Sequence, residues 1–207
     1  MLRHSGTPAF QLFPSARAPD GQGGARFGRP MTVLSVGDGP IVWESESADA
    51  TLAMGRALGT LLRPGDLVAL FGELGSGKTV LVRGLAAGLG CHPEEVRSPS
   101  FTLVNEYACR PRAGSEPGCR LAHVDLYRIA SEAEVPGLGW DEYLDGRFVV
   151  AVEWAERALG LLPRDHLRVG LEPLAHARRR LSGEGTGPRS VALVRQWLEA
   201  LCRRPAP

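Results

Sequence analysis

The sequence predicts an α/β fold in which a mainly parallel central sheet is flanked by helices. One observation is a set of short apolar runs, of which Leu67–Phe71 and residues 148–152 are typical of buried strands. Another is that segments with helical character alternate with these runs along the chain. Strands that alternate with helices favour a parallel sheet with helices on both faces.

Local signals place the first four elements. The apolar run 41–43 predicts a strand, and the serine and glutamate residues at 45–47 are capping residues for a helix over about 48–62. A Pro-Gly-Asp turn at 64–66 precedes the strand Leu67–Phe71. A helix over 80–89 follows the glycine-rich stretch 72–79, and Gly88 and Gly90 close it.

Patterning in the second half predicts five more strands and a last helix. The strands are expected at 101–107, 121–126 and 148–152, and near 166–171 and 178–181. Residues 110–119 are rich in Pro and Gly and predict an exposed connection. A helix over about 190–202 ends the predicted fold.

Residues 72–79 read Gly-Glu-Leu-Gly-Ser-Gly-Lys-Thr, the complete phosphate-loop pattern G-x-x-x-x-G-K-[ST]. Strand, loop and helix in this order point backbone N–H groups and the positive helix end at one place, where a polyphosphate binds. This predicts a P-loop NTPase-like domain, and the alternative is a glycine-rich turn without a ligand. The predicted nucleotide-binding residues of the loop are Glu73, Leu74, Gly75, Ser76, Gly77, Lys78, Thr79 and Val80.

Lys78 is the only lysine among 24 Lys and Arg residues. A chain that uses arginine elsewhere is expected to keep lysine where a compact ammonium is required, although a biased genome is the rival explanation. We expect Lys78 to reach the β and γ phosphates. We expect the Thr79 hydroxyl to bind Mg²⁺, because a hard cation prefers oxygen ligands.

Two acids stand at the ends of predicted strands. Asp125 follows the apolar run 121–124, and Glu153 follows the run 148–152. Ligands of parallel α/β sheets sit beyond the carboxyl ends of the strands. We therefore expect Asp125 to hold Mg²⁺ through its water shell and Glu153 to orient or deprotonate the attacking water, which makes Lys78, Asp125 and Glu153 the predicted catalytic residues. The alternative for either acid is a helix cap or an ion pair with an arginine.

Three further features lie near these acids in the sequence. Ser98, Ser100 and Thr102 place three hydroxyls on a proline-stiffened turn, which predicts a switch-like segment that senses the γ phosphate. An ordinary turn into a strand is the alternative. Arg128 is expected either to approach a phosphate or to form a surface ion pair. Trp154 is expected to stack on adenine or to fill the core, and the core is the better default.

Length and composition predict one domain. With 207 residues, 43% of them hydrophobic, the chain is long enough for one well-buried domain and too short for two ordinary ones. Residues 1–30 are rich in Gly, Pro, Ala and Arg and predict a disordered extension, so the predicted domain covers 31–207. An arginine-rich transit peptide, or a true start at Met31, are alternatives for the extension.

The charge, hydrophobicity and cysteines of the chain limit the partners and the compartment that we expect. The net charge of +1 argues against a dedicated polyanion-binding surface. The arginines at 178–180 favour a solvated strand or turn over the alternative, a nucleic-acid contact. No apolar run approaches the ~20 residues that span a bilayer, so we expect a soluble cytoplasmic protein. The four cysteines show no C-x-x-C spacing, which predicts reduced thiols and neither a disulfide nor a metal framework.

The sequence favours ATP over GTP. Proteins that recognise guanine use an Asn-Lys-x-Asp motif, and this chain cannot form one because its single lysine is in the loop and its only asparagine is Asn105. A small-molecule kinase usually carries a mobile lid that excludes water. The stretch after Glu153 is too short for an obvious lid, which weakens that alternative.

Four blocks, taken in order, resemble the bacterial TsaE family, formerly called YjeE. They are residues 72–79, Val-Arg-Ser-Pro-Ser-Phe-Thr-Leu-Val at 96–104, His-Val-Asp-Leu-Tyr-Arg at 123–128 and Val-Glu-Trp at 152–154. The resemblance runs from about Glu44 to Leu181. Four ordered blocks are far more specific than the phosphate loop alone.

The resemblance implies a P-loop ATPase that works with TsaB and TsaD to make the threonylcarbamoyladenosine modification of tRNAs that read ANN codons. In that family ATP hydrolysis supports repeated turnover by TsaB/TsaD, and basal activity is low. By similarity Lys78 and Thr79 would bind phosphate and Mg²⁺, Asp125 would be the second Mg²⁺-linked residue, and Glu153 the hydrolytic acid. The segment 98–102 would be switch-like, and Trp154 would lie near the nucleotide.

The chain departs from the family pattern at three positions. Glu73 stands where aspartate is commoner, Ser100 where threonine is commoner, and Val80 where a second threonine is frequent. The first two keep their functional groups, and Val80 leaves Thr79 alone for the metal. We expect tRNA contact only through the partner complex, and no DNA binding. A P-loop small-molecule kinase and a non-hydrolysing, nucleotide-gated adaptor are the alternatives.

Overall fold

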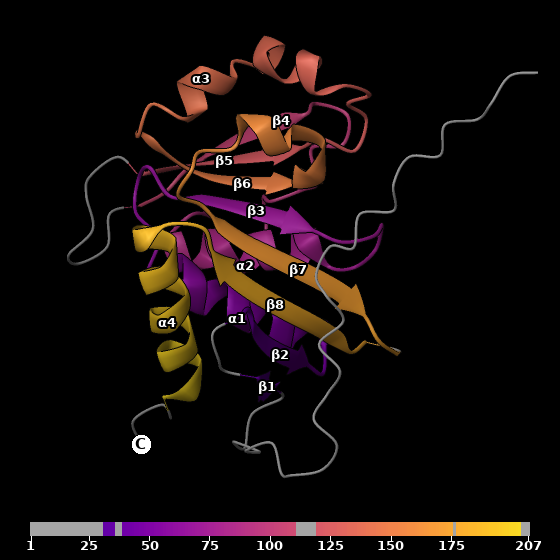
Figure 1. The fold of residues 1–207 in the computed structure, drawn as a ribbon, viewed down its shortest axis with the longest axis vertical. Coiled ribbons are helices and arrows are strands. Elements are labelled where there is room, and N and C mark those ends of the chain that lie inside the picture. The colour runs from indigo at the N-terminus through magenta and orange to yellow at the C-terminus, as the bar shows by residue number, and fades with distance from the viewer. Residues whose placement is uncertain (1–30, 36–38, 111–118, 176, 204–207) are drawn as a thin grey trace, which may run out of the picture.

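The structure, a computed structural model, describes residues 31–35, 39–110, 119–175 and 177–203. The predicted extension 1–30 and most of the predicted connection 110–119 lie outside these residues. The described part is organised around one sheet (Figure 1).

Eight strands of the described residues form this sheet in the order β1-β2-β8-β7-β3-β6-β5-β4. The strands are β1 (Met31–Ser35), β2 (Ile41–Ser45), β3 (Leu67–Phe71), β4 (Val104–Ala108), β5 (Arg120–Asp125), β6 (Phe148–Glu153), β7 (Leu167–Pro173) and β8 (Arg179–Gly185).

The α/β prediction is confirmed, and the parallel part of the sheet is its centre. β7, β3, β6 and β5 are parallel neighbours, whereas β8, β2, β1 and β4 pair antiparallel with their neighbours. Three of the antiparallel pairs, β1–β2, β4–β5 and β7–β8, join strands that follow each other in the sequence, whereas β2 and β8 lie far apart in the sequence. β1 was not predicted. β4 begins three residues later than predicted, because the chain turns at Leu103, whose φ is 65° and whose N–H donates to the Pro99 carbonyl.

Two helical layers cover the two faces of β3. Its alternate side chains Val68 and Leu70 join a core with α1 (Ala48–Gly59), α2 (Lys78–Leu89) and α4 (Pro188–Cys202). Leu67, Ala69 and Phe71 join a second core on the other face. That core is closed by α3 (Trp140–Tyr143) and two short 3₁₀ helices, η1 (Glu132–Leu138) and η2 (Ala155–Leu161).

The predicted N-terminal cap of α1 is present, but the helix ends earlier than predicted. Ser47 is the N-cap, and its hydroxyl accepts the Ala50 N–H at 3.0 Å. The helix ends at Gly59, three residues before the predicted end. At the same face, the indole N–H of Trp197 on α4 donates to the Met54 carbonyl of α1 at 3.0 Å. This bond fixes α4 against α1.

The prediction of reduced thiols is wrong for Cys91 and Cys109, because these two cysteines form a disulfide. Gly90 ends α2 in the left-handed conformation and turns the chain back, and its carbonyl accepts the Arg110 N–H at 3.0 Å. This turn sets Cys91 beside the end of β4. A separation of 18 residues has no recognisable spacing in the sequence, so only the fold brings the pair together.

Among the described residues, no helix combines the length and the apolar character that a membrane crossing requires.

Glycines set the distance between α1 and α2. Gly55 and Gly59 on α1 face Gly84 and Gly88 on α2, and a Cβ atom on Gly84 would lie 2.2 Å from the Leu52 carbonyl oxygen. The clashing atom is backbone, so the neighbour cannot move aside without shifting a helix. The close helix pair carries α2, and therefore the phosphate loop at its start, against the rest of the domain.

We predict that Gly84→Ala lowers the free energy of unfolding by about 2 kcal/mol or more, because overpacking strains a well-packed contact. Denaturant unfolding measures this. The matched control is Gly137→Ala, since a Cβ atom at Gly137 meets no atom within 4 Å. Equal effects of the two substitutions would contradict the close-packing account.

Candidate functional site

A cavity of about 310 Å³ lies beyond the carboxyl ends of β3, β5 and β6. In Figure 1 the arrowheads of β3, β6 and β7 point to this edge of the sheet. The residues that line the cavity come from the loop, α2, the strand ends and the 98–100 turn. They are Leu74, Gly75, Ser76, Gly77, Lys78, Thr79, Val80, Ser98, Ser100, Asp125, Tyr127, Glu153, Trp154 and Arg179.

The phosphate loop needs glycine at the positions where the pattern has it. Gly72 and Gly77 have φ values of 138° and 105°, which side chains rarely adopt. A Cβ atom on Gly72 would also lie 2.3 Å from the Leu171 carbonyl oxygen of β7. Gly77 is the N-cap of α2 and makes no side-chain cap bond, so the first N–H groups of the helix face the cavity without a capping side chain.

Lys78 is held inside the loop. Its ammonium donates to the carbonyls of Gly72 and Glu73 at 2.6 and 2.9 Å and lies 4.1 Å from the ring centroid of Trp154. Burial lowers its pKa, and the nearby carboxylates Glu153, Glu156 and Asp125 act in the opposite direction. The ammonium is therefore little solvated, which strengthens its interaction with any anion that enters the cavity.

Glu153 joins three elements at its carboxylate. Its Oε1 accepts the Thr79 hydroxyl of α2 at 2.7 Å and lies 2.9 Å from Nε2 of His123 on β5. Because an ionised carboxylate oxygen only accepts hydrogen bonds, Nε2 of His123 is the donor in this contact. Nδ1 of His123 is buried and has no partner among the described residues.

Asp125 is bound by the predicted switch-like turn. The hydroxyls of Ser98 and Ser100 both donate to its Oδ2, at 2.8 and 2.7 Å, and the Tyr127 N–H donates to its Oδ1 at 3.0 Å. The parallel register pairs Asp125 with Glu153, so the two acids lie side by side at the ends of β5 and β6. Hydrogen bonds therefore connect the 98–100 turn to the pair of acids at the strand ends.

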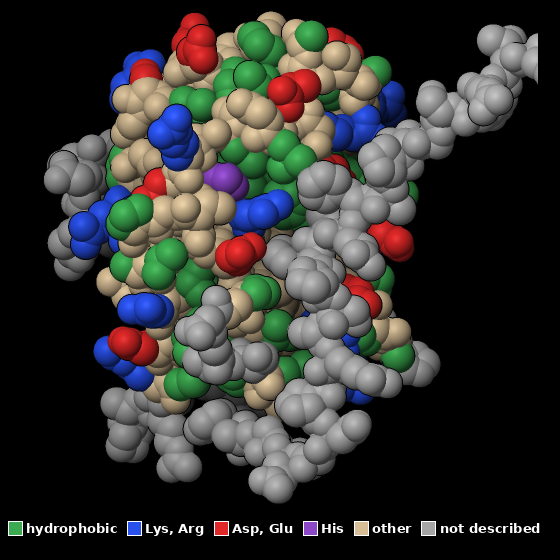
Figure 2. Space-filling model, in the orientation of Figure 1, with side chains coloured by type: hydrophobic (Ala, Val, Ile, Leu, Met, Phe, Trp, Pro, Cys, Tyr) green, Lys and Arg blue, Asp and Glu red, His purple; other side chains and the backbone are tan. Residues whose placement is uncertain are grey.

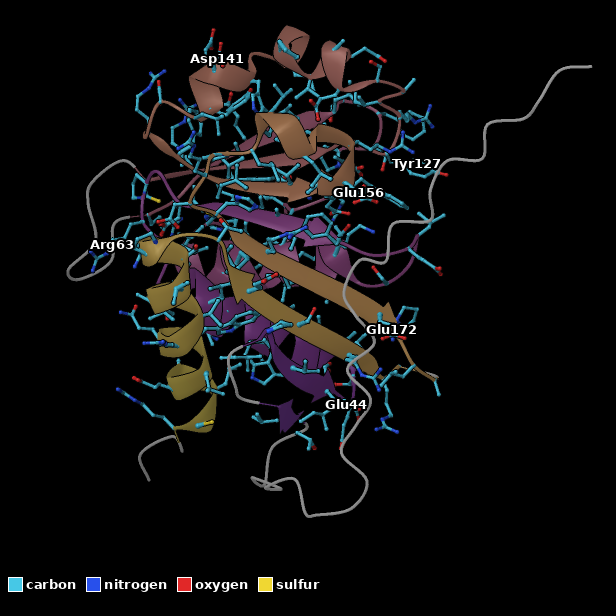
Figure 3. All side chains as sticks on the ribbon, in the orientation of Figure 1. Glu44, Arg63, Tyr127, Asp141, Glu156 and Glu172 are labelled. Atoms are coloured by element: carbon cyan, nitrogen blue, oxygen red, sulfur yellow. A yellow bond between two sulfur atoms is a disulfide. The ribbon has the colours of Figure 1, made fainter. Side chains whose placement is uncertain are left out.

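Two aromatic residues that follow the acids in the sequence, Tyr127 and Trp154, also line the cavity. Tyr127 and Trp154 pack with ring centroids 5.0 Å apart, and Tyr127 lies at the same edge as Glu156 (Figure 3). Trp154 has a φ of 59°, a strained conformation for a bulky residue that is often found at functional sites. Glu156 lies on η2, where burial raises the pKa of its carboxyl and the positive charge of Lys78 lowers that pKa.

The structure brings together most of the predicted site residues. The predicted residues that do not line the cavity are Glu73, Thr102 and Arg128. Glu73 is exposed and supplies only its carbonyl to Lys78, and the Thr102 hydroxyl donates to the side chain of Asn105. The Arg128 guanidinium lies 4.2 Å from the ring centroid of Phe101, which is a cation–π contact, and Arg128 is not among the residues that line the cavity.

Sequence reasoning missed three residues of the site. His123 and Tyr127 each stand two residues from Asp125. Two residues is the interval that places strand side chains on one face, and His123 lies in the same strand as Asp125, so the sequence contained a signal for His123. Arg179 had no such signal. It was expected on a solvated strand, yet it lines the cavity, and its Nε lies 3.5 Å from where a Cβ atom on Gly77 would be.

A family model described as TsaE, threonylcarbamoyl adenosine biosynthesis protein, matches residues 45–181. The chain belongs to the TsaE family. The matched range agrees with the resemblance expected from the four blocks, and it contains every residue that lines the cavity.

Curated relatives and a solved structure agree with this membership. The chain is 35% identical over 154 residues to the tRNA threonylcarbamoyladenosine biosynthesis protein TsaE of Bacillus subtilis, covering 74% of this TsaE-family chain and 91% of the relative. It is 38% identical over 138 residues to TsaE of Treponema pallidum, covering 67% and 96%. The crystal structure of YdiB from Bacillus subtilis superimposes with a TM-score of 0.62 at 28% identity, over 80% of this chain and 98% of YdiB.

We predict that Trp154 reports nucleotide binding. It is the one of four tryptophans that lines the cavity, and the other three are buried in the two cores. Addition of MgADP should change the tryptophan emission of the protein. Trp154→Phe should remove most of that change, whereas Trp140→Phe should keep it. A change that persists in Trp154→Phe would place the ligand elsewhere.

We also predict that the two serines, and not Thr102, hold the 98–102 turn. The double substitution Ser98→Ala with Ser100→Ala removes two hydrogen bonds to a carboxylate, so amide hydrogen exchange of this segment should accelerate about tenfold. Thr102→Ala is the matched control because its hydroxyl bonds outside the cavity. Equal acceleration in both variants would show that the contacts to Asp125 do not hold the turn.

Proposed function

We propose that this TsaE-family protein binds and hydrolyses Mg²⁺-ATP in the cavity, and that it thereby supports the biosynthesis of threonylcarbamoyladenosine in tRNA. The observation that carries the proposal is the convergence of Lys78, Thr79, Asp125 and Glu153 on one cavity at the start of α2. A cation, a hydroxyl and two carboxylates beside an uncapped helix start are the groups that phosphoryl transfer to water requires.

The donor set fits Mg²⁺ brought in with a nucleotide. Among the described residues, no group of three or more His, Cys, Asp or Glu side chains is placed to hold a metal alone. Thr79, Asp125 and Glu153 nevertheless offer oxygen atoms at one end of the cavity. Mg²⁺ commonly takes one or two protein ligands and completes its shell with water and substrate phosphates, and it neutralises charge on the phosphates. Thr79 and Asp125 are the residues that would hold it.

Each side chain then has a defined task. Lys78 moves its ammonium from the Gly72 and Glu73 carbonyls to phosphate oxygens, a stronger partner because both groups are charged. Glu153 orients the attacking water and accepts its proton, and His123 keeps the carboxylate in position. Ser98 and Ser100 release Asp125 when the segment responds to the γ phosphate. Trp154 and Tyr127 shield the site from solvent.

We propose TsaB and TsaD as partners and the cytoplasm as the compartment. Leu74 lines the cavity, Phe101 follows the lining residue Ser100 in the switch-like segment, and these two large apolar side chains are 74% and 83% exposed. Their position suits a partner that responds to the state of the loop. On the face shown in Figure 2, acidic and basic side chains are interspersed, and the chain has a net charge of +1. Both facts favour tRNA contact through the complex over independent binding.

The kinase and adaptor alternatives make different demands. A kinase predicts ATP consumption that rises with a small acceptor and yields a phosphorylated product. An adaptor predicts full partner activity with Glu153→Gln, which retains nucleotide binding and lacks the general base. Glu153 accepts a hydrogen bond from Thr79 and lies beside the Asp125 carboxylate. The hydrolytic proposal explains this arrangement better than either alternative does.

We predict low ATP hydrolysis by the isolated protein with Mg²⁺ and a strong stimulation by TsaB/TsaD. Lys78→Ala should lower the stimulated rate by about 100-fold or more, because it removes the cation that stabilises charge developing on the phosphates. Phosphate release measures both rates, and a product screen with small acceptors tests for a kinase. A stimulated rate that is the same in Lys78→Ala and in the wild type would contradict the proposal.

A further inference from the structure

Arg179 brings a second cation into the cavity from the side opposite the acids. β6 and β5, which end in Glu153 and Asp125, lie on one side of β3, and β7 and β8 lie on the other. Arg179 is the first residue of β8. Its Nε and Cδ lie 3.5 and 3.9 Å from the position of a Cβ atom on Gly77, so the side chain rests against the loop where α2 begins.

The register of the β7–β8 hairpin gives the three neighbouring arginines different surroundings. Arg180 faces Glu44 on β2 and Glu172 on β7, with which it pairs at 3.7 and 3.2 Å, and Arg178 pairs with the same Glu44. Figure 3 shows Glu44 and Glu172 at the same edge of the sheet. Arg179 lies on the opposite face of β8, the face of Leu181, which is part of the core around α2. Only Arg179 of the three lines the cavity.

The charge of Arg179 therefore serves a different part of the ligand from the acids. On the proposed function, the metal and the terminal phosphate lie at the end formed by Thr79, Asp125 and Glu153. A polyphosphate that starts at this end and stays in the cavity passes the start of α2 toward the β7–β8 side. The group that reaches Arg179 is then the α-phosphate, with the ribose attached to it.

We infer that Arg179 is a nucleotide-binding residue that contacts the α-phosphate side of the nucleotide. A guanidinium suits this role because it is permanently charged and its planar fork binds two phosphate oxygens at once. Its Nη1 donates to the Arg178 carbonyl at 3.1 Å, which orients the side chain before any ligand binds. The inference rests on the proposed function, since it assumes a nucleoside polyphosphate in the cavity.

Titration of MgADP and MgATP into wild type, Arg179→Ala, Arg179→Lys and Arg180→Ala tests the inference. We expect Arg179→Ala to weaken ADP and ATP equally, by about tenfold, the effect of losing a charged hydrogen-bond partner. Arg179→Lys should lose less than Arg179→Ala. Arg180→Ala, the matched control for charge and strand position, should stay within about twofold of wild type.

Competition with inorganic pyrophosphate separates the α-phosphate side from the terminal phosphates. The affinity of pyrophosphate should be the same in wild type and Arg179→Ala, because its two phosphates fill the β and γ positions and leave the α position empty. An ATP loss larger than the ADP loss, an equal loss for pyrophosphate, or no loss at all would overturn the inference. So would an equal loss in Arg180→Ala.

The outcome for Arg179 is separable from that of the proposed function. Wild-type protein that binds neither MgADP nor MgATP would contradict the proposed function itself. Wild-type binding and hydrolysis, with the same affinities in Arg179→Ala, would contradict only the assignment of Arg179. Unfolding midpoints of the four proteins show whether a lost affinity comes from a lost fold.

Discussion

The buried carboxylate of Glu153 is the constraint around which the site is arranged. Glu153 is 4% exposed, and its hydrogen bonds to Thr79 and His123 connect β6 to α2 and β5. An unpaired carboxylate at this depth would be costly, so the surrounding elements must present partners. The positions of the loop helix and of the two parallel strand ends are therefore coupled at one side chain.

The two parts of the sheet make different contributions to the cavity. The parallel centre sets the loop, Asp125 and Glu153 at one edge, because parallel strands end on the same side. The antiparallel hairpin of β7 and β8 forms the far wall, where the Leu171 carbonyl limits Gly72 and Arg179 rests against Gly77. An acidic end and a basic end in one cavity match the uneven charge distribution of a metal-bound nucleotide.

Local sequence patterns predicted the features of the site that depend on residues close together in the sequence. The loop, Asp125 and Glu153 follow from an apolar strand and the polar residue after it, and the structure brings these side chains to one cavity. Arg179 depends on the register of a hairpin about 100 residues after the loop, and the Cys91–Cys109 disulfide depends on the turn at Gly90. The composition of the 98–102 segment groups Thr102 with the two serines, but the turn before Leu103 directs the Thr102 hydroxyl to Asn105. These features are set by tertiary structure, which no short sequence window contains.

The central claim is that hydrolysis in this cavity lets TsaB/TsaD act repeatedly. The most direct test counts threonylcarbamoyladenosine formed on tRNA per TsaB/TsaD pair, with the wild-type protein and with Glu153→Gln at saturating Mg²⁺-ATP. The account predicts many modified tRNAs per pair with wild type and no more than about one with Glu153→Gln, because the variant binds ATP without hydrolysing it. Equal yields with the two proteins would contradict it.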